Sequence, residues 1–168
     1  MAIRSNGLLT FDLFPLTFFP MSRHLKPPFV GLALLALAAW LHLGPAAGWG
    51  TPMRCLPCAI ALAALGTSIL SWCFAHFLRQ RTSPWPGARP RALVTVGPYR
   101  FSRNPMYVAA TLLLLALALA IGSLPFLIPP AGFFLVMDRL YIPHEERWMT
   151  EHIGHAYDDY RRQVRRWI

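Results

Sequence analysis

The chain has 168 residues, of which 55% are hydrophobic and 14% are charged, and its formal net charge is +9. A soluble domain of this size needs more charged surface than this composition supplies, so the sequence argues against a soluble globular protein. The apolar residues are collected into long blocks, which is typical of a small protein embedded in a membrane.

The four longest apolar blocks predict membrane helices. They cover Phe29–Leu43, Cys55–Leu78, Met106–Ile121 and Leu124–Met137. A bilayer core about 30 Å thick takes roughly 20 helical residues. The second block reaches this length alone, and the others reach it with their interfacial flanks. We therefore expect an all-α integral membrane protein with about four transmembrane helices and short cytoplasmic helices at its C-terminal end.

The basic residues flank these blocks unevenly. They lie before the first block (Arg23, Lys26), between the second and third (Arg79, Arg81, Arg89, Arg91, Arg100, Arg103) and after the fourth (Arg139, Arg147, Arg161, Arg162, Arg165, Arg166). The loop between the first and second blocks carries only Arg54. This positive-inside pattern predicts that both termini and the middle loop are cytoplasmic in an inner or cell membrane. It accounts for the net charge without nucleic acid as a partner.

The start of the chain reads differently from the rest. Residues 1–20 hold an apolar stretch that is too short to span a bilayer and is interrupted by Asp12 and by prolines. Met21 then opens a basic segment that leads directly into the first block. We interpret residues 1–20 as a misannotated or disordered extension and residues 21–168 as a single membrane domain.

The three cysteines predict no disulfide framework. Cys55 and Cys58 form a C-x-x-C at the start of the second block, and Cys73 follows within it. A metal or redox site would need further ligands or a βαβ context, and the sequence offers neither nearby. We interpret all three as small apolar residues of a membrane helix and expect no metal site.

Beyond the fourth block the chain becomes amphipathic. Pro143 suits the first position of a new helix, and Glu145 and Glu146 suit its first turn because acids there favour the helix dipole. Gly154 is a typical residue at a helix C-terminus. We expect a short, charged helix over residues 155–164.

Chemistry-bearing residues gather before the third block. Asn104 and Pro105 are typical N-cap and first-turn residues, so a helix is predicted to begin there. Its free N–H groups, together with Arg103, would form an anion site at the cytoplasmic interface. Tyr107 lies about one turn further along.

The hairpin formed by the third and fourth blocks is predicted to bring two distant clusters together. Its Gly122-Ser123 turn is short, so the blocks run antiparallel and the chain returns Glu145 and Glu146 to the level of Arg103. A positive pole, a negative pole and aromatic walls suit S-adenosylmethionine, whose methionine end carries a carboxylate and an ammonium group. An alternative is that the arginines and aromatics only anchor the protein and that the glutamates are solvated.

Three motifs resemble those of a known superfamily. They are L-V-T-V-G-P-Y-R-F-S-R-N-P-M-Y at residues 93–107, I-P-H-E-E-R at residues 142–147 and I-G-H-A-Y-D-D-Y-R-R-Q-V-R-R-W-I at residues 153–168. Together they resemble the isoprenylcysteine carboxyl methyltransferase and phospholipid methyltransferase superfamily of membrane enzymes. The resemblance implies S-adenosylmethionine as cofactor. By the same resemblance, the cofactor-binding residues are Leu93, Val94, Tyr99, Arg103, Asn104, Pro105, Tyr107, Glu145 and Glu146.

Two positions depart from the superfamily pattern. Asn104 stands where the better-known members have histidine, and asparagine cannot become cationic or act as a base. Tyr141 stands where prenylcysteine-specific members carry an arginine that contacts the substrate, which makes prenylcysteine doubtful as the acceptor. No catalytic base is assigned. Asp138, the other carboxylate considered, is expected to pair with Arg139 or Arg147.

The function expected from these features is S-adenosylmethionine-dependent transfer of a methyl group to the O, S or N of a lipophilic acceptor at the cytoplasmic interface. Two alternatives stay open. Membrane reductases that use NADPH share a similar R-x-P-x-Y ending, although they are usually longer. A non-enzymatic scaffold or transport subunit is the other, but a transporter is expected to carry ionisable residues deep within its spans, which are missing from these blocks.

Overall fold

Helices make up most of the described chain. The computed structural model describes residues 26–45, 54–80 and 93–168, and these residues contain no β-strand. The predicted all-α class is therefore confirmed for this part of the protein. The predicted extension at residues 1–20 and the basic residues Arg23, Arg81, Arg89 and Arg91 lie outside the described residues.

The first two helices follow the first two apolar blocks closely. Helix α1 covers Pro27–Leu43 and begins with two prolines, whose fixed φ and missing N–H suit the first helical turn. Helix α2 covers Leu56–Gln80 and is the longest single α-helical segment. The third apolar block becomes α3, Pro105–Ile121, which starts at the predicted proline.

The turn after α3 depends on one glycine. Gly122 has φ of +73°, and its N–H donates to the Ala118 carbonyl at 2.8 Å, which closes the helix. Glycine adopts this left-handed conformation without the steric cost that a Cβ would add. The chain then reverses through the 3₁₀-helix η3, Leu124–Leu127, into α4, Ile128–Val136.

The predicted break between the fourth block and a new helix at Pro143 is wrong. Helix α4 runs through a π-helical turn, η4 (Met137–Tyr141), into α5 (Ile142–Ile153) without leaving helical backbone angles. Proline lacks an N–H and its ring crowds the carbonyl one turn earlier, but the wider π-turn ahead of Pro143 relieves that conflict. Pro143 lies in the first turn of α5 as expected, but the helix does not start anew there.

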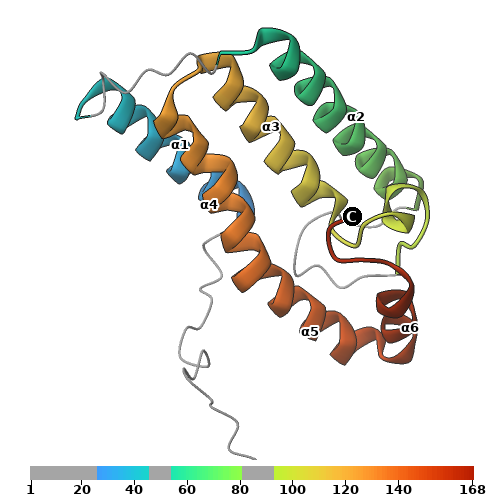
Figure 1. Ribbon diagram of the computed structural model, residues 1–168. Helices are drawn as coiled ribbons and strands as arrows, with labels where there is room; N and C mark the ends of the chain where they lie inside the picture. Colours follow the sequence, from blue (N-terminus) through green and yellow to red (C-terminus); the bar gives the residue numbers. More distant parts are fainter. Residues whose placement is uncertain (1–25, 46–53, 81–92) are drawn as a thin grey trace, which may run out of the picture.

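The end of α5 matches the sequence prediction. Gly154 terminates it with φ of +67°, and α6 covers His155–Gln163. Tyr157 and Tyr160 of α6 are both buried. The last residues then run back from α6 toward the start of α3, where the C-terminus lies (Figure 1).

The helices pack in a row in which α3 lies between α2 and α4, and α1 lies against α4 (Figure 1). One core cluster joins α1, α4 and the π-turn through Val30, Phe133, Met137, Tyr141 and Ile142. Tyr107 of α3 packs against this cluster. The core therefore extends from the middle of the bundle to the level at which α3 begins.

Within the described part of the chain, two helices are long and apolar enough to cross a bilayer. They cover Leu56–Arg79 and Leu124–Ile153. The other two apolar helices, Pro27–Leu43 and Pro105–Ile121, have 17 residues each, about 25 Å of helix. Membrane-spanning length is thus met by two of the four expected spans.

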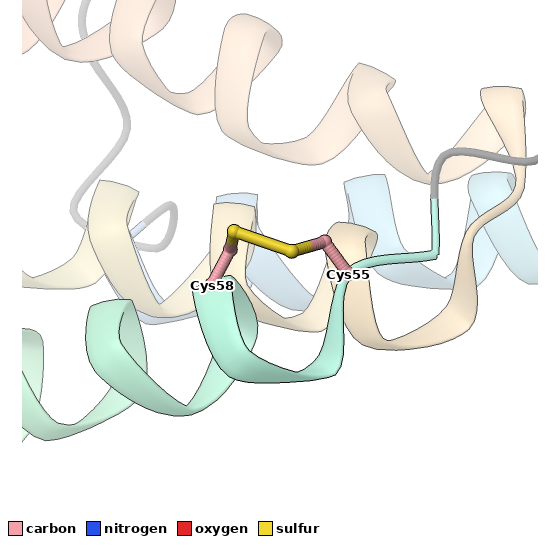
Figure 2. The surroundings of a disulfide bond; sticks show 2 residues. All are labelled: Cys55 and Cys58. Atoms are coloured by element: carbon pink, nitrogen blue, oxygen red, sulfur yellow. A yellow bond between two sulfur atoms is a disulfide. The ribbon is translucent and has the colours of Figure 1, made fainter.

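The interpretation of Cys55 and Cys58 as small apolar residues without a disulfide is wrong, because the end of the bundle where α2 begins contains a disulfide. Cys55 and Cys58 are bonded there (Figure 2), while Cys73 is a buried free thiol. The first turn of α2 places the two Cα atoms 5.3 Å apart, within the range that a disulfide requires. The Cys55 N–H also donates to the Leu119 carbonyl at 3.1 Å, which ties this turn to the end of α3.

Candidate functional site

The segment before α3 has the predicted cap residue but a different side-chain role. The Asn104 carbonyl accepts hydrogen bonds from the N–H groups of Tyr107 and Val108, at 3.0 and 3.1 Å, so Asn104 is the N-cap residue. Its side chain does not cap the helix. Instead, Nδ2 donates to the Arg166 carbonyl at 3.0 Å, because the C-terminal tail lies directly beside this turn.

Glu146 is held by two arginines. Its Oε1 lies 2.8 Å from Nη1 of Arg103, and its Oε2 lies 2.9 Å from Nη2 of Arg166. The side chains of Arg103 and Glu146 are only 11% and 10% exposed. The Arg103–Glu146 contact confirms that the hairpin returns the acidic pair to the start of α3. It also means that the predicted positive pole is already balanced by a carboxylate of the same protein.

Glu145 is held in a different way, although it is the next residue. The Tyr107 hydroxyl donates to its Oε1 at 3.0 Å, and within the described residues it forms no ion pair. Tyr99 and Tyr141 also lie close enough to interact with it electrostatically. A carboxylate partly withdrawn from water and lacking a cation is poised to bind one.

Tyr141 adds an unused polar group beside Glu145. The residue is 6% exposed, and its hydroxyl is buried without a hydrogen-bond partner among the described residues. Buried hydroxyl groups almost always have a partner, so an unpaired one beside a carboxylate is suited to a ligand atom. The Phe133 ring lies edge-on to Tyr107, with the ring centres 6.3 Å apart, and completes an apolar wall.

Tyr99 lies in the short 3₁₀-helix η2, Gly97–Arg100, which rests on α2. Its ring meets Phe77 edge-on at 5.8 Å, and its carbonyl accepts a hydrogen bond from the Tyr160 hydroxyl at 2.7 Å. Burial raises the pKa of the Tyr99 phenol, so its hydroxyl stays protonated at neutral pH. This contact network fixes the ring at the C-terminal end of α2.

The structure thus brings most of the predicted site residues into one neighbourhood. The polar and aromatic members are Tyr99, Arg103, Asn104, Tyr107, Glu145 and Glu146, and Pro105 starts the helix that carries Tyr107. Val94 is buried and Leu93 is half-buried in the segment that leads into η2. These two are connected to the neighbourhood through Tyr99 of the same segment.

Sequence reasoning missed two residues at the C-terminus. Arg166 reaches Glu146 and Asp138, and the indole N–H of Trp167 donates to Asp138 Oδ1 at 2.9 Å. The expected Asp138–Arg139 pair is present at 3.4 Å, but Arg139 is largely exposed. The signal for these residues is the R-R-W-I ending, which belongs to the motif at residues 153–168 but was given no side-chain role at the site.

Comparison with known proteins identifies the family. The family model for phospholipid methyltransferases matches residues 55–156, which include α2, α3, the π-turn and the Glu145-Glu146 pair. The chain therefore belongs to the phospholipid methyltransferase family, part of the superfamily that the three motifs indicated. Neither the curated proteins nor the solved structures contain a match.

Family membership favours one of the function classes left open by the sequence. It supports a membrane methyltransferase rather than a reductase or a scaffold, and the family generally uses S-adenosylmethionine. The apolar helices agree with a membrane location.

Proposed function

We propose that this protein is an S-adenosylmethionine-dependent methyltransferase that methylates the O, S or N of a lipophilic acceptor at the cytoplasmic face of the membrane. The family match supports the class of reaction. The observation that carries the proposal within the structure is the difference between the two adjacent glutamates. Glu146 is neutralised by two arginines, whereas among the described residues Glu145 forms no ion pair and accepts a hydrogen bond from the Tyr107 hydroxyl.

The residues around Glu145 fit the amino end of the cofactor. An ammonium group needs a carboxylate, and Glu145 is oriented for one by the Tyr107 hydroxyl at 3.0 Å. The unpaired Tyr141 hydroxyl supplies a further polar contact in the same place. Tyr99, with Leu93 and Val94 before it, would line the apolar slot for the adenine ring.

The start of α3 would serve the carboxylate end of the cofactor. Arg103, Asn104 and Pro105 shape a turn whose helix N-terminus favours negative charge. Because Arg103 is paired with Glu146 of α5, Arg103 holds this turn against α5 and does not offer an unpaired charge to the cofactor carboxylate.

When bound, S-adenosylmethionine supplies an electrophilic methyl group on a positively charged sulfur. The protein's part is to hold the two ends of the cofactor, to exclude water and to leave the acceptor aligned for attack. An acceptor carboxylate needs no base, whereas a thiol or an ammonium group must first lose a proton. We assign no residue to that step.

The membrane arrangement that we propose has four crossing helices with both termini in the cytoplasm. Three arginines, Arg79, Arg100 and Arg147, lie in segments that meet at the end of the bundle where α3 begins. Arg54 lies at the other end, against Gly122. This distribution supports a cytoplasmic site under the positive-inside rule.

The acceptor is proposed to enter from the lipid. Its reactive head would lie at the interface, and its tail would lie among residues 112–119 of α3 and 126–134 of η3 and α4. Phe134, Leu135, Leu117 and Ile128 of α3 and α4 are exposed apolar residues. A lipid acceptor also agrees with the family to which the chain belongs.

One titration tests the proposed cofactor. Protein purified in detergent is titrated with S-adenosylmethionine and, separately, with NADPH, and the heat of binding and the thermal midpoint are followed. We expect saturable binding and stabilisation with S-adenosylmethionine alone, since a ligand that binds the folded state raises its stability. Stabilisation by NADPH alone would support the reductase alternative, and no response to either would contradict the proposed enzyme.

A further inference from the structure

The C-terminal tail, residues Val164–Ile168, leaves α6 in an extended conformation and returns to the turn before α3 (Figure 1). The N–H of Arg103 donates to the Arg165 carbonyl at 3.0 Å. The Arg166 carbonyl accepts from Asn104 Nδ2 at 3.0 Å and from the Ser102 hydroxyl at 3.4 Å. Ser102, Arg103 and Asn104, three consecutive residues of the motif at residues 93–107, therefore each donate a hydrogen bond to the tail.

The side chains of the tail reach in the opposite direction, to the last long helix. Arg166 donates through Nε and Nη2 to the two oxygens of Glu146, at 3.3 and 2.9 Å, and its Nη1 lies 3.4 Å from Asp138 Oδ1. Trp167 donates to the same Asp138 oxygen, and its ring packs against Phe134 at a tilt of 32°, with the ring centres 4.5 Å apart. Hydrogen bonding to Glu146 raises the pKa of Arg166 further, so it stays cationic.

The tail therefore joins the turn before α3, the π-turn and α5, three segments that are far apart in sequence. These segments carry the groups assigned to the cofactor, since Tyr107 follows the turn and Glu145 precedes Glu146. Without Arg166, Glu146 would keep only Arg103, and the negative charge next to Glu145 would be less well balanced.

We propose that the C-terminal tail is a strap that sets the cofactor affinity, with Arg166 as its positioning residue. This inference rests on the proposed function. Arg166 does not need to touch the cofactor, because it acts through Glu146 and through the turn that its carbonyl holds. A strap that favours the binding geometry must in turn be stabilised by the ligand, since coupling between two sites is reciprocal.

Arginine is the residue that this strap requires. Its planar guanidinium binds both oxygens of Glu146 and still directs a third N–H to Asp138, whereas the single ammonium of lysine cannot match that fork. Arg165 provides a matched control. It precedes Arg166 in the tail and carries the same charge, but its side chain is exposed and only its carbonyl is used.

The test compares Arg166→Gln, Arg166→Lys and Arg165→Gln with the wild-type protein, with S-adenosylmethionine binding measured by calorimetry well below each thermal midpoint. We expect Arg166→Gln to weaken binding by about fivefold to a hundredfold, the usual range for coupling between two sites, with partial recovery in Arg166→Lys. Arg165→Gln should bind as the wild type does. If the wild type binds and Arg166→Gln binds equally well, the strap is refuted while the proposed function stands.

A second measurement needs no variant and decides the matter if Arg166→Gln fails to fold. Trypsin release of the tail from the wild-type protein, by cleavage after Arg165 or Arg166, is followed by mass spectrometry with and without S-adenosylmethionine. If the tail is a strap, trypsin should release it several-fold more slowly in the presence of S-adenosylmethionine. The ligand concentration is chosen so that it does not inhibit trypsin acting on a soluble substrate. An unchanged or faster release would overturn the proposal. A wild-type protein that shows no binding at all would instead contradict the proposed function.

Discussion

Replacing Glu145 with glutamine removes the negative charge from the proposed ammonium site with little change of shape. Glutamine keeps an oxygen that can accept the hydrogen bond from the Tyr107 hydroxyl, now 3.0 Å from Glu145 Oε1. The fold should therefore survive while a charge-assisted contact to the cofactor is lost. Such contacts contribute about 1.5–3 kcal/mol, which corresponds to a roughly 10- to 150-fold weaker affinity for S-adenosylmethionine.

Two other glutamates on the same helix supply the controls. Glu151 is exposed, so Glu151→Gln should leave the affinity unchanged. Glu146 is paired with Arg103 and Arg166, so Glu146→Gln should lower the free energy of unfolding of the unliganded protein by about 3 kcal/mol. It should also weaken the affinity, because the C-terminal tail acts on the cofactor site through Glu146. Calorimetric titration and thermal unfolding in the same detergent separate the two effects. Equal, small changes in affinity for the Glu145 and Glu151 variants would refute Glu145 as the ammonium site and return it to a solvated role.

Three further predictions concern topology, the turns and the acceptor. A cysteine introduced in place of exposed Pro45 should react with a membrane-impermeant thiol reagent added outside the cell, and one introduced in place of exposed Glu151 should not. Pro45 is chosen as the outer position because Ser123, in the other turn at that end, is only 5% exposed and would react poorly. The reverse pattern would invert the proposed orientation. Gly122→Ala should lower the thermal midpoint more than Gly154→Ala. Both glycines have positive φ, but of the two only Gly122 would place a Cβ against neighbouring atoms, the nearest at 2.7 Å. Equal decreases of the thermal midpoint would show that backbone strain alone matters. Methyl transfer to acceptors with a common head should rise with tail length, by about 0.8 kcal/mol per buried CH₂ until the groove is filled. A rate that is best with the shortest acceptor would rule out entry from the lipid.

The sequence predicted the approach of the acidic pair to the start of α3 because the argument needed only lengths. Two apolar blocks of similar length joined by a short turn must return the chain to the level it left, and the 2.8 Å contact between Arg103 and Glu146 confirms this. Helix ends set by local chemistry were equally predictable. Pro105 starts α3, and Gly122 and Gly154 end α3 and α5.

The order of Glu145 and Glu146 in the chain did not predict which of them pairs with arginines and which accepts a hydrogen bond from Tyr107. On a helix, adjacent side chains point about 100° apart, so each meets a different set of neighbours. Which of the two meets the arginines depends on how α5 is rotated about its axis. That rotation follows from the π-turn at Met137–Tyr141, which adds width to the helix just before Pro143.

By itself, the sequence determined that this protein is all-helical, that its apolar blocks suit a membrane, and that a polar cluster gathers at one end of a helical hairpin. These features depend on composition, on the spacing of apolar residues along the chain and on local turn residues, and each of these acts over a short stretch of sequence. Only the tertiary structure decided what the C-terminal tail does and that Arg103 is balanced within the protein. Those outcomes depend on contacts between residues at least 20 positions apart, such as Arg166 with Glu146 and Asn104 with Arg166, whose geometry is set by the packing of the helices between them.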